Sequence, residues 1–187
     1  MWSKFKKVFL NILFPMPELP ENIRLYDTLF CSTCRARLPR GLKICHRSSQ
    51  FLLGAATDYK DEIKQLIWQM KYRNRYTLSG PLAGLLCSYL STLNLNLSTF
   101  IVIAIPLSEK RLATRGYNQS ALIAKIIAEK FNLLVIDGAL VRQKDSAPQA
   151  EQKGWAERAL NIKGCFGIAC PELISGKNII LIDDVFT

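Results

Sequence analysis

The chain has 187 residues, of which 49% are hydrophobic and 21% are charged, and its formal net charge is +10. This composition is typical of a globular protein with one core and at most a small appendage, and no window is apolar enough to span a membrane. We therefore expect a cytoplasmic protein without a transmembrane segment, in which the six cysteines do not form a disulfide framework.

The first fifty residues are the most basic part of the chain, with nine Lys or Arg against three acidic residues. Such a field attracts polyanions, including DNA, RNA and phosphorylated metabolites. A solvated basic surface without a specific partner explains the charge equally well. Residues 1–17 join a basic patch to a short apolar segment without a cleavage site. This pattern predicts an amphipathic helix that docks on the protein or on a membrane surface.

Residues 31–48 predict a small zinc-ribbon-like segment, because a Cys-x-x-Cys pair is followed after a basic turn by a third cysteine. Tetrahedral zinc usually takes four ligands in two such pairs, but Ser48 stands where the second pair would end. Zinc binding and a metal-free remnant both stay open. The candidate metal ligands are Cys31, Cys34, Cys45 and His46.

From residue 57 onward, helical and strand patterns alternate, which predicts an α/β fold with a largely parallel sheet flanked by helices. Apolar periodicity predicts helices over 57–73, 81–93 and 118–131, the first with Thr57 or Asp58 as its N-cap. Apolar runs predict strands over 100–105, 133–136, 164–168 and 179–182, the last buried on both faces. We assign residues 1–50 to the N-terminal helix and zinc-ribbon-like segment, and 51–187 to the α/β domain.

Two adjacent carboxylates, Asp183 and Asp184, follow the last apolar run directly. Ligands of open α/β sheets bind beyond the carboxyl ends of the strands, so these acids are candidates for a site. Successive side chains on a strand point to opposite faces, and a turn at Asp184 is needed to aim both at one ligand. A plain strand end, with the acids leading into a helix, is the alternative.

A second polar concentration lies between the strand at 100–105 and the helix that begins near residue 118. Arginine forks and amide donors at this place suit an anion such as pyrophosphate. Gly116 permits a positive-φ turn or a close backbone approach, and a polar loop with Asn118 as helix N-cap is the alternative to an anion site. The polar connection over 141–163 has the length and charge of a mobile lid. The candidate anion-binding residues are Arg111, Arg115, Asn118 and Gln119.

Together these segments resemble the ComF family, a competence-associated group that includes GntX-like proteins. The resemblance covers nearly the whole chain and implies a zinc-ribbon-like segment joined to a type I phosphoribosyltransferase-like domain. NIILIDDVFT resembles that domain's signature for phosphoribosyl pyrophosphate (PRPP). The segments that carry the resemblance are LFP (13–15), the cysteine pair, IKQLIWQMKY (63–72), IPLSEKRLATRGYNQS (105–120), the stretch from a Gln to ERALNIKGCF (149–166) and LIDDVFT (181–187).

The resemblance also implies roles for the candidate residues. Asp183 and Asp184 would contact the ribose hydroxyls of PRPP, with Mg²⁺ bridging the pyrophosphate. Thr187 would begin the loop that holds the 5′-phosphate, so we expect a chain truncated within this domain. The arginines and amides near residue 115 would face the pyrophosphate. Arg142, Arg158 and either Gln149 or Gln152 would match the flexible connection.

The resemblance leaves the following functions open. The first is an accessory role in DNA uptake, competence or DNA processing, with single-stranded DNA or competence and DNA-processing proteins as partners. The second is a phosphoribosyltransferase using PRPP and Mg²⁺, although the sequence offers no identifiable nucleobase pocket. The third is an inactive truncated fragment.

Overall fold

The centre of the fold is a parallel sheet. The computed structural model describes residues 23–31, 51–144 and 163–186, and in these the sheet has three strands in the order β4-β3-β7. They are β3 (Phe100–Ala104), β4 (Leu134–Val135) and β7 (Asn178–Ile182). β3 and β7 pair along their whole length in parallel, whereas β4 pairs with only two residues of β3. The expected α/β fold with a parallel sheet is therefore confirmed for this part of the chain.

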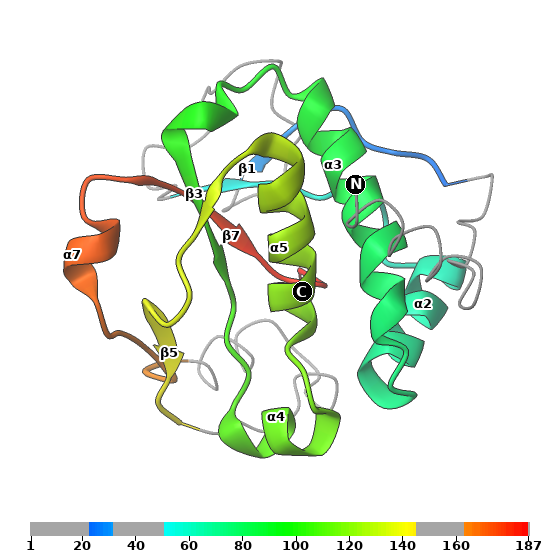
Figure 1. Cartoon of the computed structure of the whole chain (residues 1–187). Helices are drawn as coiled ribbons and strands as arrows, with labels where there is room; N and C mark the ends of the chain where they lie inside the picture. Colours follow the sequence, from blue (N-terminus) through cyan, green and yellow to red (C-terminus); the bar gives the residue numbers. More distant parts are fainter. Residues whose placement is uncertain (1–22, 32–50, 145–162, 187) are drawn as a thin grey trace, which may run out of the picture.

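Helices cover one face of this sheet, as Figure 1 shows, with α5 in front of β3 and β7 and with α3 and α2 to its right. The helices are α2 (Asp61–Tyr72), α3 (Ser79–Thr92) and α5 (Gln119–Phe131). The core between them and the sheet contains Met70, Ile123, Ile127 and Val102, all fully or nearly fully buried. Ile123 and Ile127 are one helical turn apart on α5, and Met70 follows the buried Ile63 and Ile67 of α2 at helical spacing, which is the pattern that predicted these helices.

The N-terminus of α2 differs from the sequence-based expectation. The N-cap is Lys60, without a side-chain hydrogen bond, rather than Thr57 or Asp58. The Thr57 hydroxyl instead donates to the carbonyl oxygen of Arg24 at 2.9 Å, and Asp58 accepts from the hydroxyl of Tyr26 at 2.7 Å. Both residues therefore bind the segment before the cysteine region and are not available to cap the helix.

Two antiparallel strand pairs lie outside the parallel sheet of the described residues. β1 (Phe30–Cys31) pairs with β2 (Leu52–Leu53), and β5 (Leu140–Arg142) pairs with β6 (Phe166–Ile168). β6 was expected as a strand, but β5 falls where the sequence suggested the start of a polar connection. The helices α4 (Glu109–Arg115) and α7 (Pro171–Ile174) were also not expected. Elements this short carry too few residues for a periodic signal.

β7 is not buried on both faces as its continuous apolar run suggested. Ile182 lies in the core beneath the helices, whereas Ile179 and Leu181 are 40% and 52% exposed on the other face. Their neighbours in the sheet register, Ile101 and Ile103 of β3, are buried on that same face. On this face the described segments therefore cover β3 and leave the edge strand β7 exposed.

The zinc-ribbon-like segment lies almost entirely outside the described residues. Only Cys31 of its candidate ligands is described, and it is buried at the end of β1. Within residues 23–31, 51–144 and 163–186, no three His, Cys, Asp or Glu side chains are grouped as metal ligands. No helix in these same ranges is long and apolar enough to cross a membrane.

Candidate carboxylate site at the end of β7

Asp183 and Asp184 lie at the carboxyl end of β7, beside the N-terminus of α5. The backbone N–H of Asp184 donates to Oδ1 of Asp183 at 2.8 Å, which closes a local turn. The same oxygen accepts a hydrogen bond from the Ser120 hydroxyl at 3.1 Å. The first acid of the pair is therefore held by α5, and the turn directs the second acid elsewhere.

Asp184 is held by α2 through an ion pair. The ammonium of Lys71 lies 2.9 Å from Oδ1 of Asp184, and the two side chains are 23% and 4% exposed. The other carboxylate oxygen, Oδ2, is buried and has no hydrogen-bond partner among the described residues. An unpaired buried carboxylate oxygen is unfavourable, because desolvation is not compensated. The site therefore has an unused acceptor that a cation or a ligand hydroxyl could satisfy.

The Asp183 carboxyl binds its proton more tightly than an ordinary aspartate. Burial, and after it the neighbouring Asp184 carboxylate, raise the pKa of Asp183 to about 6. Hydrogen bonds from Ser120 and from the backbone of Asp184 act in the opposite direction, because they stabilise the charged form. The residue as a whole is exposed, so protons and ions can reach the carboxyl group.

Arg111 and Arg115 lie on a helix rather than in the loop that the sequence suggested. α4 begins after Ser108, whose hydroxyl oxygen accepts from the backbone N–H of Arg111 at 3.4 Å. It ends at Gly116, which has a φ of 80° and thus the positive-φ conformation expected for this glycine. The two arginines are one helical turn apart, so both side chains project from the same side of α4.

Asn118 and Gln119 make contacts that fix the start of α5. The Asn118 side chain accepts from the backbone N–H of Ser120 at 3.0 Å and donates to the carbonyl oxygen of Ile105 at 2.9 Å. Gln119 is 4% exposed, and its side-chain oxygen accepts from the guanidinium of Arg115. The N-cap interpretation of Asn118 is therefore confirmed. The pyrophosphate role of these residues stays a prediction.

The structure adds Lys71, Tyr117 and Ser120, which the sequence analysis did not name. The Tyr117 hydroxyl donates to the carbonyl oxygen of Met70, next to Lys71, and so fastens the end of α2 to the α4–α5 connection. All three lie within IKQLIWQMKY or IPLSEKRLATRGYNQS, two of the segments that carried the family resemblance. These two segments and LIDDVFT thus meet at one edge of the sheet. The family resemblance of all three segments was the sequence feature from which the three residues could have been identified.

Other candidate residues lie elsewhere or outside the described ranges. Arg142 is on β5, where its guanidinium lies 5.2 Å from the ring centroid of Phe166 and donates to the carbonyl oxygen of Lys144 at 3.3 Å. In Figure 1, β5 lies on the opposite side of the sheet from α2. The predicted site residues outside the described ranges are Gln149, Arg158, Thr187, Cys34, Cys45 and His46.

The chain is similar over most of its length to curated bacterial proteins. It is 26% identical over 171 residues to the DNA utilization protein YhgH of Escherichia coli O157:H7, covering 86% of this chain and 73% of that protein. It is 26% identical over 180 residues to YhgH of Salmonella typhi, covering 94% and 72%. It is 25% identical over 185 residues to the competence protein ComFC of Bacillus subtilis strain 168, covering 99% and 70%. No family model and no solved structure matches the chain.

Proposed function

We propose that this chain is a ComF-type accessory protein of DNA uptake or DNA utilization, with a PRPP-binding-type domain. The observation that carries the proposal is its similarity, over 86% to 99% of its length, to proteins named for DNA utilization and for competence. The net charge of +10 supports it, because a strongly basic protein attracts nucleic acid. In this role the protein holds DNA or a DNA-processing partner.

Binding of single-stranded DNA tests this proposal directly. The purified chain is titrated into a labelled oligo(dT) at low salt and then at increasing salt. We expect binding whose affinity falls linearly with salt on logarithmic axes, because lysines and arginines release counterions from phosphates. An absence of binding at low salt would overturn the proposal for direct contact with DNA.

A second candidate function, binding and transfer from PRPP with Mg²⁺, is supported by the carboxylate site. Asp183 and Asp184 provide oxygen ligands of the kind that Mg²⁺ or ribose hydroxyls prefer, and Oδ2 of Asp184 has no hydrogen-bond partner in residues 23–31, 51–144 and 163–186. Lys71 and Ser120 hold the two carboxylates in fixed orientations. Mg²⁺, when bound, would neutralise charge on the pyrophosphate. The chain's own contribution is then orientation of the sugar hydroxyls.

Thermal unfolding with ligands tests this second function. We expect Mg²⁺ together with PRPP to raise the melting temperature, because a ligand that binds only the folded state stabilises it. Mg²⁺ with ribose 5-phosphate is the matched control without pyrophosphate. The variant Asp184→Asn should lose the shift. No shift with Mg²⁺ and PRPP in the unsubstituted chain would exclude PRPP binding by this chain.

A further inference from the structure

Exposed aromatic residues gather on one part of the described structure. Six aromatic side chains stand among its exposed large hydrophobic residues, and five of these lie within residues 51–76. Burial of such rings is favourable, so several exposed in one region indicate a surface with a partner. The five are Phe51, Tyr59, Trp68, Tyr72 and Tyr76, between 44% and 62% exposed.

The same region is basic where the rings lie closest together. The fourteen residues 63–76 contain four lysines and arginines and no acidic residue. Lys71 is paired with Asp184, whereas Lys64, Arg73 and Arg75 are exposed. The guanidinium of Arg73 lies 5.3 Å from the centroid of the Trp68 ring. A cation therefore stands beside the Trp68 ring, whereas the sequence around Tyr59 combines Lys60 with Asp58 and Asp61.

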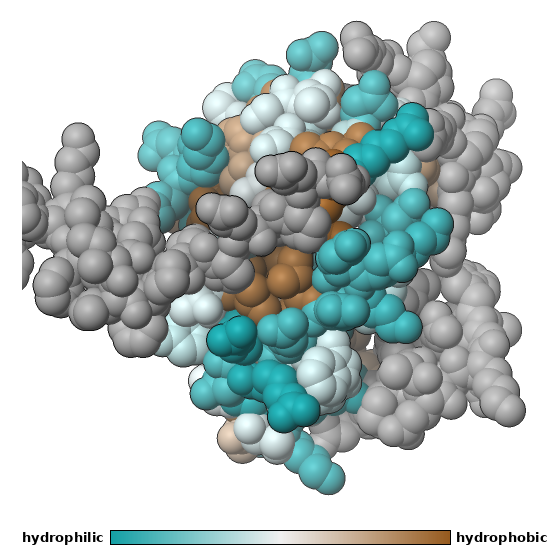
Figure 2. All heavy atoms as spheres, turned by 90° about the vertical axis from the view of Figure 1, so that its right-hand side faces the viewer, coloured by the Kyte–Doolittle hydropathy of each residue, from teal (hydrophilic) through white to brown (hydrophobic). Residues whose placement is uncertain are grey.

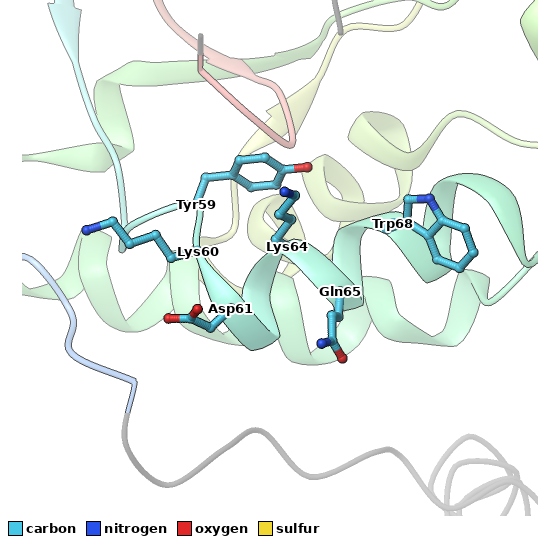
Figure 3. A pocket seen from close by; sticks show the side chains of 6 residues that line it. All are labelled: Tyr59, Lys60, Asp61, Lys64, Gln65 and Trp68. Carbon is cyan, nitrogen blue, oxygen red and sulfur yellow. The ribbon is translucent and has the colours of Figure 1, made fainter.

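Helical spacing aligns these groups along α2. Lys64, Trp68 and Tyr72 follow one another at intervals of four residues, and the Trp68 and Tyr72 ring centroids are 5.8 Å apart. In Figure 3, Tyr59, Lys64 and Trp68 lie along one side of α2, whereas Asp61 and Gln65 point to the other. A shallow surface pocket runs along this part of the helix. Its lining residues are Tyr59, Lys60, Asp61, Lys64, Gln65 and Trp68.

Figure 2 shows the molecule from the side that lies at the right in Figure 1, where α2 and α3 are found. Hydrophilic residues border a hydrophobic area, and residues of intermediate hydropathy lie among the hydrophilic ones. Cations beside exposed rings are the combination that single-stranded nucleic acids require, with cations for phosphates and flat rings for bases.

We propose that the surface along α2, here called the aromatic-basic surface and formed by Tyr59, Lys64, Trp68, Tyr72 and Arg73, binds single-stranded DNA by stacking bases on its rings. The inference rests on the proposed function in DNA uptake or utilization and adds the surface at which the DNA binds. Paired bases within a duplex do not offer their faces to protein side chains, so the surface discriminates against double-stranded DNA. Lys71 is paired with Asp184 and is not part of this surface, so substitutions of the rings leave the ion pair of the carboxylate site in place.

The test compares variants by fluorescence anisotropy of fluorescein-labelled oligo(dT). The double variant Trp68→Ala/Tyr72→Ala should weaken binding about tenfold or more while leaving the salt dependence unchanged, because stacking releases no counterions. Arg73→Gln should weaken binding and lower the salt slope by about one unit. Matched controls are Leu173→Ala, an exposed hydrophobic residue on α7, and Lys125→Gln, an exposed cation on α5. Unchanged far-UV circular dichroism shows that the variants fold.

The possible results distinguish a failure of this inference from a failure of the proposed function in DNA uptake or utilization. If the unsubstituted chain binds oligo(dT) and Trp68→Ala/Tyr72→Ala binds equally well, the surface is wrong while the DNA role stands. If the unsubstituted chain binds no DNA at low salt, the proposed function fails as well. Equal affinity for a duplex of the same length would overturn stacking. Retained oligo(dT) binding by Asp184→Asn would support a site separate from the carboxylates.

Discussion

The ammonium of Lys71 lies 2.9 Å from Oδ1 of Asp184 and joins the end of α2 to the end of β7. Asp184 is 4% exposed, so the pair fixes a nearly buried carboxylate, and its other oxygen has no hydrogen-bond partner within the part of the chain that the structure describes. The neighbouring acid, Asp183, accepts a hydrogen bond from the hydroxyl of Ser120 on α5. Two helices distant in sequence thus orient neighbouring acids at one edge of the sheet, and the following predictions test this arrangement.

Replacing Lys71 by methionine should destabilise the protein. The substitution keeps the length and apolar stem of the side chain but leaves the Asp184 carboxylate buried without its cation. We expect the free energy of unfolding to fall by about 2 kcal/mol, below the range for fully buried pairs because Lys71 keeps some solvent contact. Urea denaturation measures this. Lys64→Met, an exposed lysine on the same helix, is the control, and equal losses in the two variants would contradict a special role for the pair.

Asp183 should make stability depend on pH. Its pKa is raised from 3.8 to about 6 in the folded chain. Between these values the native state holds a proton that the unfolded state has released, so the free energy of unfolding decreases as pH rises through this window. Solvent contact at Asp183 limits the size of the effect. Denaturant titrations across the window should show a shallower decrease for Asp183→Asn, and identical slopes would refute the assignment.

Removing the Ser120 hydroxyl should move this pH dependence to higher pH. The hydrogen bond stabilises the charged carboxylate, so its loss in Ser120→Ala raises the pKa of Asp183 further. Stability at neutral pH should also fall by about 1 kcal/mol. Ser79→Ala is the matched control, because that buried hydroxyl donates at 2.7 Å to the carbonyl oxygen of Tyr76 and not to an acid. A similar pH shift in both variants would exclude the Ser120–Asp183 contact as its cause.

Asn118 should behave as a capping residue. Asn118→Ala removes the acceptor for the Ser120 N–H and the donor to Ile105, and should cost about 1 to 2 kcal/mol of stability. Asn118→Ser keeps a capping oxygen and should lose less. Thermal or urea unfolding of the two variants distinguishes them. Equal stability of Asn118→Ala and the unsubstituted chain would show that the cap contributes nothing.

Sequence reasoning succeeded where a local rule was sufficient. A helix over 118–131 was predicted from apolar periodicity, with Asn118 as a possible N-cap, and the structure has α5 over Gln119–Phe131. β3 was predicted from an unbroken apolar run. Gly116 was identified as a positive-φ position, which the structure confirms. It failed at α4, where the polar seven-residue helix has no buried residues and therefore no apolar pattern to detect.

The candidate site was predicted only in part. The position of Asp183 and Asp184 followed from a strand signal and the rule that ligands bind at strand ends. Lys71 was missed because it lies more than a hundred residues earlier in the chain, on a helix whose end reaches the acids only after folding. Ser120 was missed because a serine in the first turn of a helix is an ordinary feature, and its role depends on which strand lies beside it.

The sequence by itself determined the alternation of elements, the parallel pairing and the place of the acidic pair, because periodicity and turn chemistry act over a few neighbouring residues. Only the tertiary structure decided which partners the acids have, because hydrogen bonds and ion pairs depend on distances between elements far apart in the chain. It also decided that Ile179 and Leu181 stay exposed. An apolar run indicates that a strand can be buried, but it does not show whether another segment covers each face.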